Sequence, residues 1–143
     1  MRLLATLIFS VLVLFADNKT NYLKAQILEK VFSNISINNE LIVWSNNSEL
    51  LSEFKKNAHL DTAVNCENAT LLIVENKDKL NDICKEKTMF VLNYNLLNDF
   101  PKSFGALFWK KGRPNIVIIE PRTKAQSIKI SKNLEEYLEE AIW

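Results

Sequence analysis

The fold is decided by residues 71–92, LLIVENKDKLNDICKEKTMFVL. Two uninterrupted apolar runs, residues 71–74 and 89–92, enclose a polar segment. Short apolar runs rich in β-branched residues are typical of strands buried on both faces of a sheet. Residues 78–85 have helical spacing, with an inner face formed by Leu80, Ile83 and Cys84. This order of strand, helix and strand predicts a parallel pair joined by a crossover helix.

The same alternation continues toward the N-terminus. Apolar residues recur at four-residue spacing over residues 21–32, which predicts an amphipathic helix. Residues 41–44 form a third apolar run, and we expect this strand to be parallel to the other two. Asn46, with Glu49 three residues later, predicts a capping box at the start of the next helix. Residues 62–64 are a candidate for a short edge strand.

Toward the C-terminus the pattern predicts one helical turn at residues 96–100, ended by Pro101, and then a hairpin. Two β-rich runs, residues 104–109 and 116–119, flank a polar loop whose turn contains Gly112. Gly105 lies inside the first run, where a glycine indicates a bulge or close packing. A last helix is expected after Ser131, with an inner face formed by Leu134, Tyr137, Leu138, Ala141 and Ile142.

These elements predict a single α/β domain over residues 17–143. We expect a small layered fold, with a mixed and mostly parallel central sheet flanked by helices. The domain should end in the β-hairpin and a C-terminal helix.

The first sixteen residues have the composition of a signal peptide. Arg2 supplies a positive charge, and an apolar or small run follows over residues 3–15. This run is shorter than the roughly 20 residues that a membrane span requires. Ala16 is a plausible end of the leader, although Leu14 is large for the position three residues before cleavage. We therefore expect export to the periplasm, with an uncleaved membrane tether as the alternative.

The sequence has two cysteines, Cys66 and Cys84. An even cysteine number in an exported chain favours a disulfide. The predicted strand 70–75 runs away from Cys66 and the helix after it returns Cys84 toward the same end, provided that residues 65–69 fold back. The alternative is a pair of separate buried thiols.

No motif for catalysis, metal binding or cofactor binding stands out. His59 is the only histidine, and two cysteines with one histidine at irregular spacing do not predict a metal site. Two isolated glycines do not build a phosphate-binding loop. The net charge of +1 gives no general attraction to nucleic acid. We therefore expect a non-enzymatic protein without a cofactor or metal.

One charge asymmetry suggests a binding surface. Between residues 102 and 132 there are eight basic residues and one acid, Glu120. The candidate surface lies at the hairpin tip and consists of Phe108, Trp109, Lys110, Lys111 and Arg113. Aromatic residues and arginine beside lysines suit an acidic partner domain or anionic headgroups. Ordinary solvation of the hairpin is the alternative.

The order of features resembles the YfiR-like family of periplasmic proteins. The resemblance rests on a first helix, a cysteine before the strand 71–74, and the hairpin from Gly105 to the return strand 115–119. It also includes residues 128–131 and Leu134 before the last helix. The family includes a periplasmic repressor of a membrane-bound diguanylate cyclase. The resemblance therefore implies a periplasmic regulator that binds the outer domain of a membrane signalling protein.

Two other functions fit the same residues. One is a periplasmic small-ligand-binding module, although a single small domain lacks the two lobes that usually close on a solute. The other is a structural protein held at the membrane by an uncleaved leader. The oligomeric state is not predicted.

Overall fold

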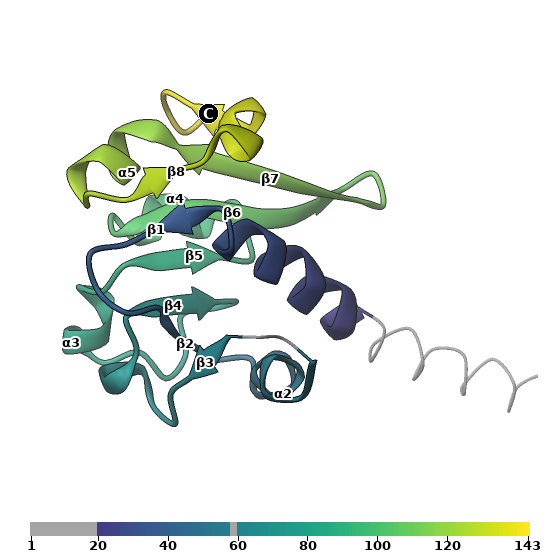
Figure 1. The fold of residues 1–143 in the computed structure, drawn as a ribbon, viewed down its shortest axis with the longest axis vertical. Helices are drawn as coiled ribbons and strands as arrows, with labels where there is room; N and C mark the ends of the chain where they lie inside the picture. The colour runs from purple at the N-terminus through teal and green to yellow at the C-terminus, as the bar shows by residue number, and fades with distance from the viewer. Residues whose placement is uncertain (1–19, 58–59) are drawn as a thin grey trace, which may run out of the picture.

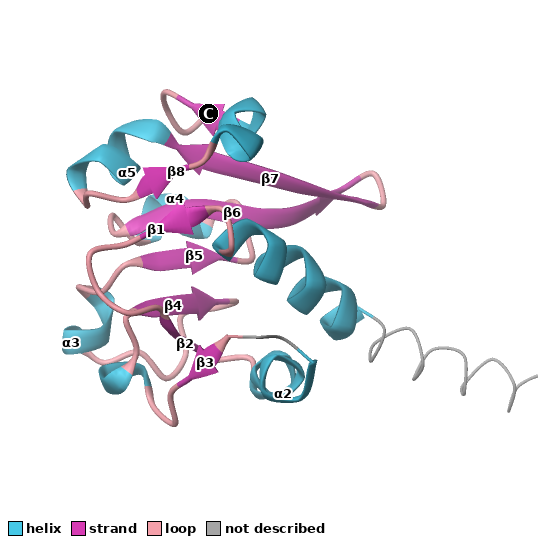
Figure 2. Ribbon diagram, in the orientation of Figure 1, coloured by secondary structure: helices cyan, strands magenta, loops and turns pink. Residues whose placement is uncertain are grey.

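The computed structural model describes residues 20–57 and 60–143, and for Asn57 the backbone alone. Its centre is a seven-stranded mixed sheet (Figures 1 and 2). The strands, in order across the sheet, are β3 (Asp61–Thr62), β2 (Ile42–Ser45), β4 (Leu71–Val74), β5 (Met89–Val91), β6 (Ser103–Lys110), β7 (Arg113–Ile119) and β9 (Leu138–Glu139). Among these described strands, β6 and β7 form the antiparallel pair and the other neighbours are parallel. The predicted α/β class and the parallel arrangement of β2, β4 and β5 are confirmed.

Successive residues of the central strands enter two different cores. Leu71 and Ile73 of β4 pack with the helix of residues 20–32, while Leu72 and Val74 pack against the opposite face. This follows from the two-residue side-chain period of a strand. The helix of residues 20–32 crosses the front of the sheet in Figure 1, and α4 (Leu96–Asp99) lies behind it. The apolar runs in the sequence therefore reflect coverage on both faces.

The helix-covered face also carries a second, two-stranded sheet. Its strands are β1 (Ile35–Ser36) and β8 (Lys129–Ile130), which pair antiparallel. The side chain of Asn34 next to β1 accepts hydrogen bonds from Ser131 Oγ at 2.9 Å and Asn133 Nδ2 at 3.1 Å. Residues from both ends of the described chain are therefore joined over one face of the main sheet.

The helix α3 is shorter than expected. It spans Asp82–Lys85, because the Asn81 side chain caps it by accepting a hydrogen bond from the Cys84 N–H at 2.8 Å. Lys79 just before it has a φ of 62°, which is not helical. Ile83, expected on the inner face, is 65% exposed, whereas Cys84 is fully buried. A single helical turn directs only one side toward the sheet. Cys84 lies on that side, and Ile83 therefore faces away from it.

The cap of α2 (Ser48–Asn57) is also one residue later than expected. Asn47 Oδ1, rather than Asn46, accepts the hydrogen bond from the Leu50 N–H at 3.0 Å. Asn46 instead bridges to the loop after β4: its Oδ1 accepts from the Glu75 N–H at 2.9 Å. Of the two adjacent asparagines, one caps the helix and the other binds the loop after β4. The capping rule alone does not say which of them is the cap.

The expected C-terminal helix begins after Ser131 as predicted, but it is shorter and of the 3-10 type. After Ser131 the chain forms a 3-10 helix, η2 (Lys132–Tyr137), and then the strand β9. Leu138 pairs with Ile118 on the edge of the main sheet, and Leu134 is buried. Ala141, expected to face inward, is exposed. A short isolated helix has marginal stability, so pairing with β7 prevails over the helical pattern.

Both glycines have the structural roles that the sequence predicts. A Cβ on Gly105 would lie 2.7 Å from Phe90 Cε2 and 2.7 Å from the backbone oxygen of Val117. The register between β5 and β6 also shifts next to this position, which is a bulge. Gly112 has a φ of +75° in the hairpin turn, where a side chain would strain the backbone.

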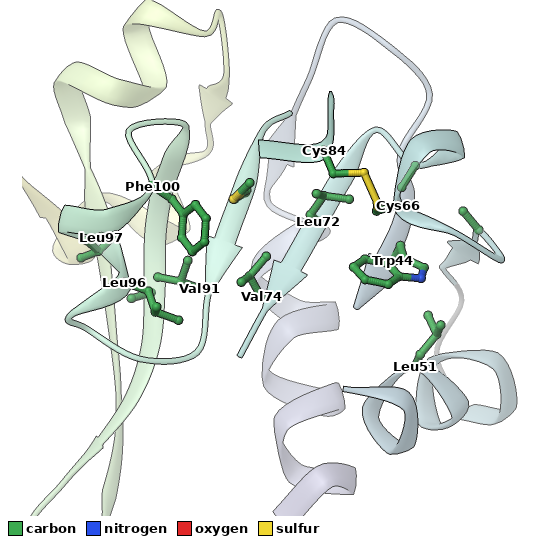
Figure 3. Packing of buried hydrophobic residues seen from close by; sticks show 14 of the residues in the cluster. Trp44, Leu51, Cys66, Leu72, Val74, Cys84, Val91, Leu96, Leu97 and Phe100 are labelled. Carbon is green, nitrogen blue, oxygen red and sulfur yellow. A yellow bond between two sulfur atoms is a disulfide. The ribbon is translucent and has the colours of Figure 1, made fainter. Parts of the chain in front are cut away.

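The predicted disulfide is confirmed. Cys66 and Cys84 are bonded, with their Cα atoms 5.9 Å apart, and both are buried (Figure 3). The chain folds back as required through η1 (Cys66–Asn68), which the Asn65 side chain caps. The disulfide lies beside Leu72 and Trp44 in the core opposite the helix of residues 20–32.

A partly buried arginine fixes the corner between α4 and β6. Arg122, in α5 (Glu120–Ala125), donates from Nη1 to Leu97 O at 2.8 Å and Ser103 O at 2.9 Å. The first of these carbonyls belongs to α4, a single turn whose last carbonyls have no partner within the helix, and the second belongs to the first residue of β6. Burial lowers the pKa of Arg122 from its usual value, but an arginine remains charged under physiological conditions. This contact ties α5 to α4 and to the start of β6.

The predicted signal peptide, residues 1–16, lies outside the described residues. Within residues 20–57 and 60–143, none of the helices combines the length and apolar content needed to cross a bilayer.

Candidate functional site

The hairpin of β6 and β7 extends past the ends of the neighbouring strands (Figure 1). Its turn consists of Lys111 and Gly112, which have φ values of 53° and 75°. Positive φ at both central residues is the conformation that matches the twist of a two-residue hairpin. Lys110 and Arg113 close the turn as directly opposite residues. This two-residue turn therefore presents the basic residues at the tip.

The hairpin places Trp109 on the face covered by the helix of residues 20–32. Lys24 Nζ of that helix lies 5.9 Å from the Trp109 ring centroid and 3.0 Å from Glu75 Oε1. The Trp109 side chain is 38% exposed, so one part of its ring rests near the lysine while another part faces water. Cation–π attraction within about 6 Å restrains the ring on this side.

Phe108 and Lys110 lie on the opposite face of the hairpin, since adjacent strand residues alternate in direction. Phe108 contacts Tyr94, with ring centroids 5.2 Å apart, and Tyr94 stacks on Trp143 at 5.1 Å. The Trp143 N–H of the backbone donates to Tyr94 Oη at 2.9 Å. Lys110 Nζ lies 6.0 Å from the Trp143 ring centroid, and Trp143 is 72% exposed.

The five residues predicted from the sequence therefore do not form one flat patch. Trp109 lies on one face of the hairpin, and Phe108 and Lys110 lie on the other. Arg113 is the direct cross-strand partner of Lys110 and shares its face. Lys110, Lys111, Arg113 and Asn115 line a shallow hollow of about 370 Å³. We call residues 108–113 together with Trp143 the hairpin surface. It is a protruding tip with an exposed indole on each face, and Lys110 lies on the same face as Trp143.

Sequence reasoning missed Tyr94, Trp143 and Lys24 as members of this region. Tyr94 had a usable signal, because it follows the carboxyl end of β5 and the carboxyl ends of parallel strands meet at one edge. Lys24 gave no distinguishing signal within an amphipathic helix. Trp143 depends on the path of the chain after η2, which was expected to be helical.

The carboxyl edge between β2 and β4 is filled by the protein's own amides. Asn46 Nδ2 donates to Asn76 O at 2.8 Å and to Asp78 O at 3.1 Å, and Glu75 is engaged by Lys24. In open α/β sheets this crevice is the usual ligand site. Here its polar atoms are already paired with one another, so it has a structural role.

No ligand-like cluster of acidic, histidine or cysteine side chains able to hold a metal occurs in residues 20–57 and 60–143. His59, the only histidine of the sequence, lies outside the described residues.

A second hollow lies across β7 from the hairpin surface. It is a groove of about 720 Å³ between the helix of residues 20–32, the first half of β7 and η2. Its apolar lining is formed by Ile27, Val31, Pro114, Ile116, Leu134 and Tyr137. Its polar lining is formed by Lys30, Asn34, Asn115, Asn133 and Glu136. Burial, followed by the negative charge of Glu136, raises the pKa of Tyr137, so this phenol remains neutral near pH 7.

The chain matches no protein-family model, no curated protein and no solved structure.

Proposed function

We propose that this protein is an exported, non-catalytic regulator that binds the periplasmic domain of a membrane signalling protein through the hairpin surface. The observation that carries the proposal is the pair of exposed indoles, Trp109 and Trp143, flanked by Lys110, Lys111 and Arg113. Tryptophan and arginine are the residues most enriched among those that dominate binding energy in protein interfaces. The resemblance to the YfiR-like family suggests a diguanylate cyclase as one such membrane protein.

The geometry of the tip supports a protein partner. A protruding turn suits insertion into a concave surface, and the aromatic side chains beside it lose little conformational freedom on binding. The lysines and Arg113 favour a partner with acidic residues around that concavity, because opposite potentials accelerate association and select the partner.

The disulfide between Cys66 and Cys84 is compatible with an oxidising compartment. Such a compartment is also what the predicted leader implies. The regulator role and the periplasmic location thus belong to one proposal.

The direct test is site-specific photo-crosslinking in cells. A photoreactive amino acid replaces Trp109 or Trp143, and mass spectrometry identifies the crosslinked proteins. We expect a membrane protein with an acidic periplasmic domain to be captured from both positions. Capture of no membrane protein from either position would overturn the proposal.

Charge reversal provides the quantitative test. The triple variant K110E/K111E/R113E should weaken binding of the captured domain by at least about tenfold, because it replaces attraction by repulsion. The matched control is K55E/K56E, which reverses two exposed lysines in the last turn of α2, away from the hairpin. Equal affinity of the triple variant and the control would contradict the assignment of the hairpin surface.

A further inference from the structure

The outer edge of β7 is covered along only part of its length. Among the described strands, β9 pairs with β7 at Ile118 and Ile119, and no strand covers the edge before Ile118. β7 itself begins at Arg113, so its first half presents backbone to the outside. This uncovered half forms one wall of the 720 Å³ groove, through Pro114, Asn115 and Ile116.

The hairpin register identifies the backbone atoms on this free edge. Lys110 and Arg113 close the two-residue turn as a hydrogen-bonded pair, and bonded and non-bonded pairs alternate along an antiparallel ladder. Pro114, Ile116 and Ile118 therefore direct their backbone groups away from β6. The pairing of Ile118 with Leu138 of β9 agrees, and the Leu138 N–H is used by Glu135 O within η2.

The free edge thus offers the Pro114 carbonyl and both the N–H and the carbonyl of Ile116. Pro114 has no N–H, which limits pairing with long foreign strands, as prolines on sheet edges do. The three remaining groups face a space bounded by the helix of residues 20–32 on one side and η2 on the other.

We propose that the groove binds an extended peptide segment of the partner, which adds a short strand to the free edge of β7 in line with β9. This inference rests on the proposed function, because it describes how the same partner is held. The open backbone edge selects a peptide, since main-chain pairing supplies affinity and alternate side-chain pockets supply specificity. The groove floor of Ile27, Val31 and Leu134 receives every second side chain of the peptide, which must be apolar.

The charge pattern specifies one end of the peptide. Asn115 belongs to the lining of both the groove and the shallow hollow of the hairpin surface, so the two hollows adjoin at this residue. A peptide that leaves the groove past Pro114 reaches Lys110, Lys111 and Arg113. The recognised segment therefore combines an alternating apolar stretch with acidic residues at the end near the hairpin tip.

The test uses synthetic acetylated and amidated peptides with valine and threonine in alternation and two aspartates at one end or the other. Binding to the full chain is followed by NMR, together with hydrogen exchange of the Ile116 N–H. We expect one placement of the aspartates to bind better and the Ile116 N–H to become protected. If neither peptide binds, or if binding leaves the exchange of Ile116 unchanged, strand addition is ruled out.

Backbone methylation separates strand addition from contact through side chains alone. Two versions of the bound peptide are methylated at every second amide, in the two alternating registers. One register places the methyl groups against β7 and should lose about tenfold or more in affinity, while the other should retain binding. Equal affinities of the two versions would overturn the inference.

Three further experiments distinguish a failure of the peptide groove from a failure of the proposed function. A further peptide carries two asparagines in place of the two aspartates and should still bind the wild-type protein. The variant K110E/K111E/R113E should bind the aspartate peptide no more tightly than the wild type binds this asparagine peptide. Binding of lauric acid at the groove in place of all peptides would overturn the inference in favour of an acyl ligand. Loss of all peptide binding with retained crosslinking at Trp109 and Trp143 would leave the proposed function standing and remove only the peptide groove.

Discussion

The parallel half of the sheet and the hairpin half differ in how completely they are covered. In β4 all four residues are buried, and β5 is likewise buried on both faces. In β6 the burial ends after Leu107, and Phe108, Trp109 and Lys110 become progressively exposed toward the tip. The same type of apolar sequence therefore has two purposes: it stabilises the fold in β4 and β5, and it presents aromatic residues at the end of β6.

Two phenylalanines provide the strongest test of this difference. Phe90 is fully buried and contacts Phe32 and Phe104 edge to face, with centroids 5.5 and 5.4 Å away. Phe90→Ala should lower the free energy of unfolding by about 3–5 kcal/mol, because it leaves a cavity. Phe108→Ala, on the half-buried hairpin, should cost about 1–2 kcal/mol. Urea denaturation measures both, and an equal or larger loss for Phe108→Ala would contradict the comparison.

Removal of the disulfide should have the next largest effect. Cys66 and Cys84 close a loop with a sequence separation of 18. The double variant C66A/C84A should lose about 3 kcal/mol of stability in the chain-entropy model. Calorimetry of the variant and of the wild type checks this value, and affinity of the folded variant for its partner should stay the same because the disulfide is far from the hairpin surface. A variant as stable as the wild type would show that the disulfide contributes little to the stability of the fold.

The two glycines sharpen the comparison further. Gly105→Ala should cost about 1–3 kcal/mol, since the added Cβ meets the Val117 backbone, which has no room to move within the sheet. Gly112→Ala should cost about 1 kcal/mol, because no atom lies within 4 Å of the added Cβ and the penalty comes from its φ alone. Chemical denaturation of the two variants measures both losses of stability. A larger loss for Gly112→Ala than for Gly105→Ala would show that the interior at Gly105 is loosely packed.

Trp143→Ala should have the smallest effect on stability. The ring is largely exposed and stacks on Tyr94, so its removal should cost about 0.5 kcal/mol. Under the proposed function the same variant should weaken partner binding by about tenfold or more. Thermal unfolding and binding are measured on one sample, with Ile83→Ala as the control for an exposed apolar residue on a different surface. Equal binding by both variants would assign Trp143 no role in the interface.

The central sheet could be predicted from the sequence because its strands are buried on both faces. A short continuous apolar run such as Leu71–Val74 is best explained as a strand buried on both faces. Because these runs alternate with helices, the strands are expected to be parallel. The disulfide followed from this arrangement and from the order of its elements. Gly105 was predictable because glycine within an apolar strand has few roles.

The short elements could not be predicted, because tertiary contacts rather than local pattern determine them. Residues 134–142 have the spacing of an amphipathic helix, yet the free edge of β7 attracts Leu138 and Glu139 into a strand. Asn46 and Asn47 are equally good helix caps, and the choice depends on the loop after β4 that Asn46 reaches. The pairing of β1 with β8 has no local signal at all.

The candidate site was predictable in its residue types but not in its shape. Trp109 and the three cations lie at or next to one hairpin turn, as the sequence predicts, and their role as a contact surface stays a prediction. The division of these residues between two faces follows from the strand alternation, which could have been applied to Phe108 and Trp109 at the outset. The groove beside β7 depends on η2 and could not be inferred.

The small sheet of β1 and β8 has a consequence for the order in which the protein matures. Asn34 and Ser131, which are hydrogen-bonded to each other, are 97 residues apart in the sequence. Ile128 and Leu134 complete the core under the helix of residues 20–32, so this core needs residues that lie about 100 positions apart in the sequence. We therefore expect the fold to be completed only after residue 134 has been made.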